Sequence, residues 1–260
     1  MKKKFLSDRQ RVLIGKYKTV NKTLKKLLWI AILWVILYDF ILVNIPEWFP
    51  KASVLGLLAR NICFAYLTGF IFYFLNAHLS SHKTKVKTYR YVANKVEALN
   101  SLSMDLILAL KNSLGIPNEN YDVPTLQDVQ LWCQQIPSSS PAPFKTHMYT
   151  RTFPDWFTLF QFIDQETTKV VKDLLLIRDS LDSETLRLIT NIENNTTTFL
   201  NMSRGILINT PNHNLAFFDR FIHSYRSTCK QLSSHLQKEY KVYKEEYHYL
   251  ERKEREEKNA

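Results

Sequence analysis

The chain has 260 residues, of which 45% are hydrophobic and 23% are charged, so it is long enough for one or two modest folded domains. This composition excludes a chain that is disordered throughout. Its five glycines argue against glycine-rich phosphate loops, tightly turned sheets and barrels. The scarcity of glycine, together with many Leu, Lys, Glu and Gln residues, predicts helices, and we expect an all-α fold.

The net charge of +11 is concentrated beside two hydrophobic segments. Residues 1–26 carry a net charge of +9 and residues 79–115 carry +4, whereas residues 27–78 are neutral and residues 116–260 carry −2. Lys and Arg that flank apolar segments stay on the cytoplasmic side of a membrane. This distribution favours anionic lipid headgroups as the partner of the charge, and we expect no direct binding of nucleic acid.

Two apolar runs predict a two-span transmembrane hairpin over residues 27–79. Leu27–Ile45 contains one acid in nineteen residues, and Asn61–Leu79 has nineteen residues without a charge. A helix rises about 1.5 Å per residue, so each run can cross a bilayer core of about 30 Å. A cleaved signal peptide is rejected because the basic region before the first run is long and no small-x-small site follows it. The basic flanks and aromatic residues also disfavour two buried core helices of a soluble protein.

The flanking charges orient these spans. The basic N-terminal arm, residues 1–26, and the basic segment after the second span both belong inside, so both termini are expected in the cytoplasm. We therefore expect a multi-pass protein of the bacterial inner (plasma) membrane. The lysines expected to contact anionic headgroups are Lys22, Lys25, Lys26, Lys83, Lys85 and Lys87.

A carboxylate inside the first span, Asp39, predicts an ion pair. A charge at that depth is unfavourable unless it is paired, protonated or turned towards an internal surface. The nearest opposite charge in the sequence is Arg60, at the outer edge of the second span, and we expect the two to pair. The pair either fixes the register of the two spans or takes part in conduction or gating, and both alternatives stay open.

The second span carries a stripe of small and polar residues at helical spacing. Ala65 and Gly69 form a small-x-x-x-small pair, which allows two helices to approach closely. The stripe could pack against the first span, drive self-association into a homo-oligomer, or line a pore. Its members are Asn61, Ala65, Thr68, Gly69 and Asn76.

Beyond the second span the pattern predicts cytoplasmic helices. A juxtamembrane stalk helix over residues 80–115 carries a heptad-like seam and ends at Gly115 and Pro117. Residues 116–152 form a linker with a short helix around Thr125–Ile136 and an extended proline-serine run at Pro137–Pro143.

The remaining residues, 153–260, predict a helical bundle. The polar run Asn194–Thr198 is expected to interrupt one of its helices, and Gly205 to end that series. The highly charged C-terminal tail is expected to be a solvated helix end.

No catalytic or nucleotide-binding motif occurs, so we predict that the chain is not an enzyme and uses no cofactor. His78 and His82 lie one helical turn apart and could bind a metal, but no nearby Cys, Asp or Glu completes a ligand set, so two interfacial histidines are favoured. The scattered cysteines, which are expected to be ordinary reduced thiols, are Cys63, Cys133 and Cys229.

In topology and domain order the chain resembles the small two-transmembrane effector proteins of bacterial anti-phage systems, including those paired with retrons. The resemblance covers this layout and carries over no functional residue. It implies a toxin-like effector in antiviral defence that perturbs or permeabilises the inner membrane. It also implies a cytoplasmic protein or nucleoprotein partner, such as a reverse transcriptase bearing its nucleic acid, that holds the effector in check or triggers it. Two alternatives stay open, a membrane-tethered adaptor that binds a soluble partner and an accessory subunit of a membrane complex.

Overall fold

The computed structural model describes residues 8–45, 51–117, 123–145, 150–203 and 213–258. These residues are mostly helical, which confirms the prediction of an all-α class at that level. The chain divides into two compact units, which we call unit 1 (residues 1–87 with 242–260) and unit 2 (residues 88–241). The C-terminal helix therefore belongs with the N-terminal part of the chain, whereas the sequence pattern had suggested that it continues the bundle.

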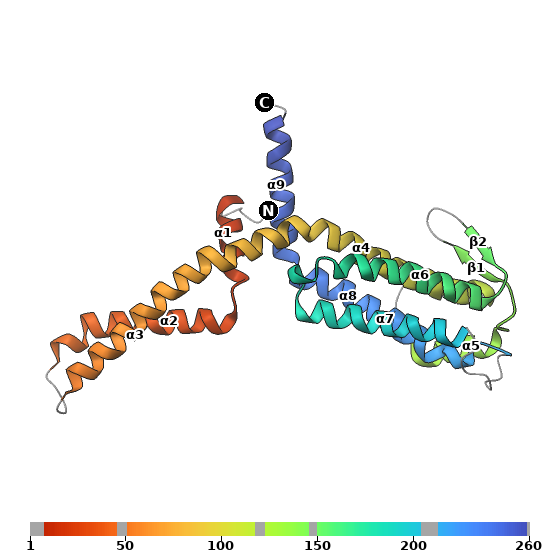
Figure 1. Cartoon of the computed structure of the whole chain (residues 1–260), viewed down its shortest axis with the longest axis horizontal. Coiled ribbons are helices and arrows are strands. Elements are labelled where there is room, and N and C mark those ends of the chain that lie inside the picture. The colour runs from red at the N-terminus through yellow and green to blue at the C-terminus, as the bar shows by residue number, and fades with distance from the viewer. Residues whose placement is uncertain (1–7, 46–50, 118–122, 146–149, 204–212, 259–260) are drawn as a thin grey trace. The chain divides into compact units, whose positions relative to one another are not determined.

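Unit 1 is built from helices that the apolar and basic segments form (Figure 1). Its elements are α1 (Asp8–Lys18), α2 (Lys22–Phe40), the 3-10 turn η1 (Leu42–Asn44), α3 (Ala52–Tyr73), the π-helical turn η2 (Phe74–His78), the first part of α4 (Leu79–Ser113), and α9 (Lys241–Lys258). Asn21 begins α2, because its side chain accepts a hydrogen bond from the Thr23 amide.

A single helix runs without a break through α3, η2 and α4, from Ala52 to Ser113. Among the described residues it is the one helix that is long and apolar enough to cross a membrane, by length and composition. By contrast, α2 contains Lys25, Lys26 and Asp39, which shorten its uncharged stretch. The predicted second crossing and the inner-membrane location therefore stay predictions.

α2 and α3 pack side by side in opposite directions, as Figure 1 shows. The Tyr66 hydroxyl donates to the Leu24 carbonyl across 2.9 Å near one end, and the Tyr38 hydroxyl donates to the Ser53 carbonyl across 3.3 Å near the other. Gly56 allows this approach, because a Cβ placed there would lie 2.3 Å from the Tyr38 ring. The glycine at the close contact between α2 and α3 is therefore Gly56.

Unit 2 is a helical bundle with one small sheet. It comprises the rest of α4, then α5 (Leu126–Gln135), β1 (Ala142–Lys145), β2 (Thr150–Phe153), α6 (Trp156–Leu175), η3 (Arg178–Ser180), α7 (Ser183–Ser203), η4 (Ala216–Phe218) and α8 (Asp219–Glu239). α7 packs against both α6 and α8, and α5 packs against α8. Large aromatic side chains fill this core, among them Trp156, Phe160, Phe199, Phe218 and Tyr225.

The predicted stalk seam is buried within this chain. Along α4 the side chains that lie at most 1% exposed include Val92, Val96, Leu99, Ser103, Leu106 and Leu110. Ion pairing of Lys95 with Asp173 of α6, at 2.5 Å, joins α4 to the bundle. α4 ends as predicted, because Gly115 adopts φ 68° and the Ile116 amide donates back to the Lys111 carbonyl.

One local expectation for unit 2 was wrong, and one element was not anticipated. The proline-serine run leads directly into β1, which pairs antiparallel with β2, with Ala142 opposite Phe153. The sheet forms because Phe144 and Phe153 both point into the core. The polar run Asn194–Thr198 does not interrupt α7, because Thr196 is fully buried and its hydroxyl donates to the Glu193 carbonyl. Gly205 lies outside the described residues.

Candidate functional site

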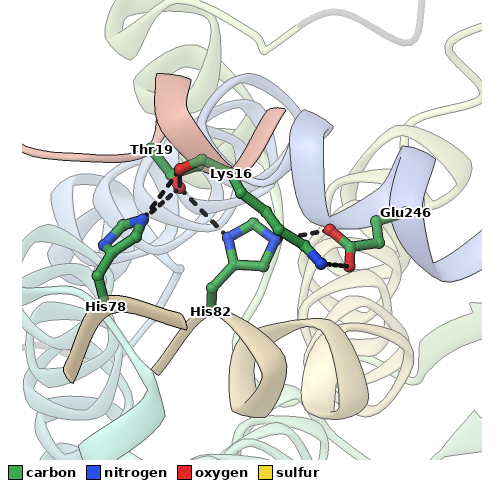
Figure 2. A network of polar contacts seen from close by, with 5 residues as sticks. All are labelled: Lys16, Thr19, His78, His82 and Glu246. Carbon is green, nitrogen blue, oxygen red and sulfur yellow. Dashed lines mark hydrogen bonds and ion pairs between the residues drawn. The ribbon is translucent and has the colours of Figure 1, made fainter. Parts of the chain in front are cut away.

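The most connected polar cluster in unit 1 joins three separate parts of the sequence (Figure 2). Lys16 lies in the last turn of α1 and Thr19 just after it, His78 ends the π-turn, His82 lies in α4, and Glu246 lies in α9. We call these five residues the network. His78 and His82 share one helix face because they are four residues apart, so both rings reach the end of α1.

Glu246 is the acceptor that holds α9 in the network. Its Oε2 lies 2.7 Å from His82 Nε2, and its Oε1 lies 3.2 Å from Lys16 Nζ. On the other side of the His82 ring, Nδ1 lies 3.2 Å from the Thr19 hydroxyl. His78 Nε2 lies 2.9 Å from the Lys16 carbonyl and 3.2 Å from the Thr19 hydroxyl. Each helix is therefore tied to the other two by a polar contact.

The hydrogen atoms can be assigned from donor and acceptor chemistry. An ionised Glu246 only accepts, so His82 Nε2 carries a proton and donates it. Nδ1 of a neutral His82 accepts from the Thr19 hydroxyl. Nδ1 of a charged His82 donates to that hydroxyl, which then donates to the Lys16 carbonyl at 2.8 Å. Rotation of one hydroxyl thus lets the network accommodate either form of the ring.

The network is buried as well as charged. His82 is 2% exposed and Glu246 is 6% exposed. Burial by itself raises the pKa of Glu246, but hydrogen bonds and charge interactions with His82 and Lys16 outweigh burial, so the pKa lies below its ordinary value. A buried carboxylate held in its charged form needs these partners, because an unpaired buried charge is strongly unfavourable.

Packing around the network is mainly aromatic. The Tyr243 ring of α9 lies 5.0 Å from the His82 ring, measured between centroids, and Lys85 Nζ lies 5.8 Å from the centre of the Tyr243 ring. A Cβ placed on Gly15 of α1 would lie 3.0 Å from a methyl group of Val242 in α9. α1 and α9 therefore approach closely just beside the buried charges.

The network consists of ion pairs and hydrogen bonds that connect helices. Within the described residues there is no group of three or more His, Cys, Asp and Glu side chains that could hold a metal ion. Glu246 contacts the second histidine, and a lysine ammonium occupies its remaining oxygen. A carboxylate neutralised by lysine is poorly suited to a cation, so the arrangement connects helices and offers no metal centre.

The ion pair predicted between the first two apolar helices is present. Arg60 Nε lies 2.6 Å from Asp39 Oδ1, and Arg60 Nη2 donates to Asp39 Oδ2 across 3.3 Å. The guanidinium also lies 4.9 Å from the centre of the Phe64 ring. This contact joins α2 to α3 next to the hydrogen bond of Tyr38, which fits the register role.

The stripe along α3 and η2 faces away from α2, so of the three alternatives the structure does not support packing against the first span. The residues of α3 that contact α2 lie on the opposite side of the helix, as the bonds of Arg60 and Tyr66 show. A Cβ added to Gly69 would meet no atom within 4 Å. All members of the stripe are exposed in the single chain, namely Asn61, Ala65, Thr68, Gly69 and Asn76.

The two polar side chains furthest along the stripe bond to their own helix. The Thr68 hydroxyl donates to the Phe64 carbonyl across 3.0 Å, and the Asn76 amide donates to the Phe72 carbonyl across 3.1 Å. Such bonds partly satisfy a polar group inside a membrane. The stripe is therefore compatible with lipid as well as with a second protein surface.

The predicted lipid-facing lysines lie at the ends of the apolar helices. Lys22 and Lys26 are exposed, as are Lys83 and Lys87. Lys25 is half-buried because its ammonium donates to the Lys18 carbonyl across 3.0 Å and lies over the Tyr17 ring. The half-buried Lys85 lies over Tyr243, so these two lysines also stabilise the protein fold.

Sequence reasoning found only part of the network. The spacing of His78 and His82 was noticed, but their partners are remote in sequence and were not identified. Glu246 sits in a tail expected to be a solvated helix end, and that expectation was wrong for this buried residue. A weak signal exists, because residues 243 and 246 share one helix face.

Comparison with known proteins adds no relative. No family model, no curated protein and no solved structure matches the chain.

Proposed function

We propose that the chain is a membrane-acting effector that permeabilises the bacterial inner membrane, with α2 and α3 as its two spans and both termini in the cytoplasm. A cytoplasmic protein or nucleoprotein partner restrains or triggers it through unit 2. The observation that carries this proposal is the outward-facing stripe on α3, because it offers copies of the chain a polar, closely packing surface inside the membrane.

The apolar surfaces of α2 and α3 support a place in the bilayer. Leu33 and Phe40 on α2 are 67% and 75% exposed, and Phe72 on α3 is 70% exposed. Each of these helices buries one residue, Ala31 in α2 and Phe70 in α3. Core helices of a soluble protein would be mostly buried, so a lipid environment suits these two better.

A second crossing by α2 is compatible with its charges. Lys22, Lys25 and Lys26 lie in its first turns, where long side chains reach the headgroups. Asp39 is paired with Arg60, which lowers the free energy of placing either group near the membrane. The exposed charges of α2 thus gather at its ends and the apolar residues lie between them.

The adaptor alternative has one specific observation in its favour. Because Thr68 and Asn76 bond to their own helix, the stripe does not require a protein partner in lipid. A hairpin that only anchors unit 2 would tolerate leucine at these positions. The two functions therefore predict opposite results for the same substitutions.

The deciding experiment is inducible expression in bacteria with a voltage-sensitive dye. We expect rapid depolarisation by the intact chain, and its loss in Thr68→Leu and Asn76→Leu at equal membrane abundance. Ile71→Leu, an exposed apolar position outside the stripe, is the matched control and should depolarise like the parent. Depolarisation that persists in the leucine variants would remove the stripe from the mechanism, and no depolarisation by an abundant, correctly inserted parent would favour the adaptor.

A further inference from the structure

The last helix, α9, is attached to the rest of unit 1 through a small buried surface. Of its eighteen residues, Tyr243 and Glu246 are buried, and the residues after Glu251 are exposed. Helices with few buried apolar side chains open at low free energy compared with core helices. α8 has eight buried residues in twenty-one, so it is held far more firmly than α9.

A non-helical residue, Tyr240, separates α8 from α9. α8 ends at Glu239, Tyr240 leaves the helical conformation at ψ 6°, and α9 begins at Lys241. The amide of Tyr240 still donates to the Leu236 carbonyl and so closes α8. Because α8 has its own end, α9 can leave unit 1 without loss of helical hydrogen bonds in α8.

The contact that holds α9 reaches the end of the apolar helix. Glu246 bonds to His82, and the network continues through Thr19 to His78, the last residue of the π-turn. π-helical turns are rare and occur often at functional sites. The state of α9 is therefore linked by direct contacts to an irregular turn that follows α3.

Buried charge limits the net stability of this attachment. Docking removes Glu246, His82 and most of Lys16 from water, and that loss of hydration offsets much of the attraction between them. Removal of one partner is different, because it leaves an uncompensated buried charge and is strongly unfavourable. The docked state should thus depend sharply on Glu246 while having a modest net stability.

We propose that α9 is an intramolecular latch, docked through Glu246 in the resting protein and released when the protein acts on the membrane. This proposal rests on the membrane-effector function proposed above. The docked helix holds α1 and the π-turn in one arrangement. Release removes Glu246 from His82 and Lys16, so that α1 is then held to the π-turn by the contacts of Thr19 and the Lys16 carbonyl.

The test is a disulfide between α1 and α9. Gly15→Cys and Val242→Cys place two thiols where a Cβ and a methyl carbon approach to 3.0 Å, which is within disulfide reach. The full-length double variant is expressed in bacteria and oxidised in isolated membranes. Digestion with trypsin then shows whether the two segments stay covalently joined, and each single-cysteine variant reports background.

Glu246→Gln is combined with the two cysteines to weaken the latch. Gln offers one acceptor oxygen where Glu offers two, so either His82 or Lys16 loses its partner. We expect the cross-link to form about tenfold more slowly than in the double-cysteine parent. Glu245→Gln removes the same charge at the exposed neighbouring position and should leave the cross-linking rate unchanged.

Membrane potential is measured on the same variants. Glu246→Gln alone should depolarise cells sooner than the parent. Because the cytoplasm keeps thiols reduced, the locked form is measured in isolated membrane vesicles, where the oxidised disulfide should delay depolarisation until a reductant is added. A cross-link that fails to form, or that is insensitive to Glu246→Gln, would overturn the latch whatever the depolarisation result. Equal depolarisation by locked and unlocked forms would overturn it too. A Glu246-dependent cross-link without depolarisation in any variant would overturn the effector function while leaving the docking of α9 supported.

Discussion

Glu246 accepts a hydrogen bond from His82 across 2.7 Å, although 164 residues separate them in sequence. His82 lies in α4, one helical turn beyond the end of the π-turn, whereas Glu246 lies in α9. The pair joins the two sequence segments that form unit 1, residues 1–87 and residues 242–260, at one buried contact. It also gives a charged residue in the tail a structural role that its local sequence does not suggest.

Gly56 and Gly69 should respond in opposite ways to added side chains. In Gly56→Ala the new Cβ would overlap the Tyr38 ring, so the ring must move and its hydrogen bond to the Ser53 carbonyl is lost. We expect destabilisation of the α2–α3 pair by about 1–3 kcal/mol. Gly69→Ala meets open space and is the matched control, expected to be neutral or slightly stabilising. Unfolding of the purified chain by titration of SDS into mixed micelles would measure both.

The Asp39–Arg60 pair should behave as a unit. Asp39→Leu or Arg60→Met alone leaves one unpaired charge beside the apolar helices, and we expect each to destabilise the α2–α3 pair by about 3 kcal/mol. The double variant removes both charges and should recover most of the loss. A double-mutant cycle on thermal unfolding in lipid nanodiscs would give the coupling energy. Coupling near zero would mean that the pair does not fix the register of the helices.

Asp182 predicts a pH dependence for the start of α7. Burial alone raises its pKa, but hydrogen bonds from Thr185 and His235 outweigh burial and bring the pKa below its ordinary value. Because the folded pKa is lowered, ionised Asp182 stabilises the fold fully above the unfolded value of about 4, and this stabilisation is lost as the pH falls through the lowered pKa.

Asp182→Ala tests this dependence. It removes the acceptor of the Thr185 amide, and we expect faster amide exchange at the first turn of α7 at pH 7, by an amount equivalent to about 1 kcal/mol. The difference between parent and variant should shrink at pH 3, after correction for the intrinsic exchange rate. Asp179→Ala, at a fully exposed carboxylate nearby, is the control. An equal difference at both pH values would show that the ionisation of Asp182 contributes nothing.

The buried cysteines should be inert. Burial raises the pKa of both the Cys133 and the Cys229 thiols to about 12, so almost no thiolate is present at neutral pH. A maleimide added to the folded chain should modify neither residue until denaturant is present, and mass spectrometry of the digested protein would show this. Rapid labelling of Cys229 without denaturant would mean that α8 opens readily, which is against the packing seen in unit 2.

The helical class, the basic flanks and the Asp39–Arg60 pair followed from the sequence alone. Helix periodicity and charge are local properties, and a charge in an apolar run has few possible partners. The end of α4 at Gly115 was likewise readable, because a residue with positive φ favours glycine. The heptad-like seam correctly identified the buried face of α4, since burial follows helical spacing.

The tertiary structure alone decided which surfaces meet. Glu246 lies in a highly charged tail and is buried only because α1 and α4 pack against it, and these neighbours are remote in the chain. The direction of the stripe on α3 depended in the same way on which face α2 covers. Likewise, Thr196 stays helical within a polar run because the bundle buries it. Local periodicity predicts helices but does not say which helices pack together, so the contacts of Glu246 could not be predicted from the sequence.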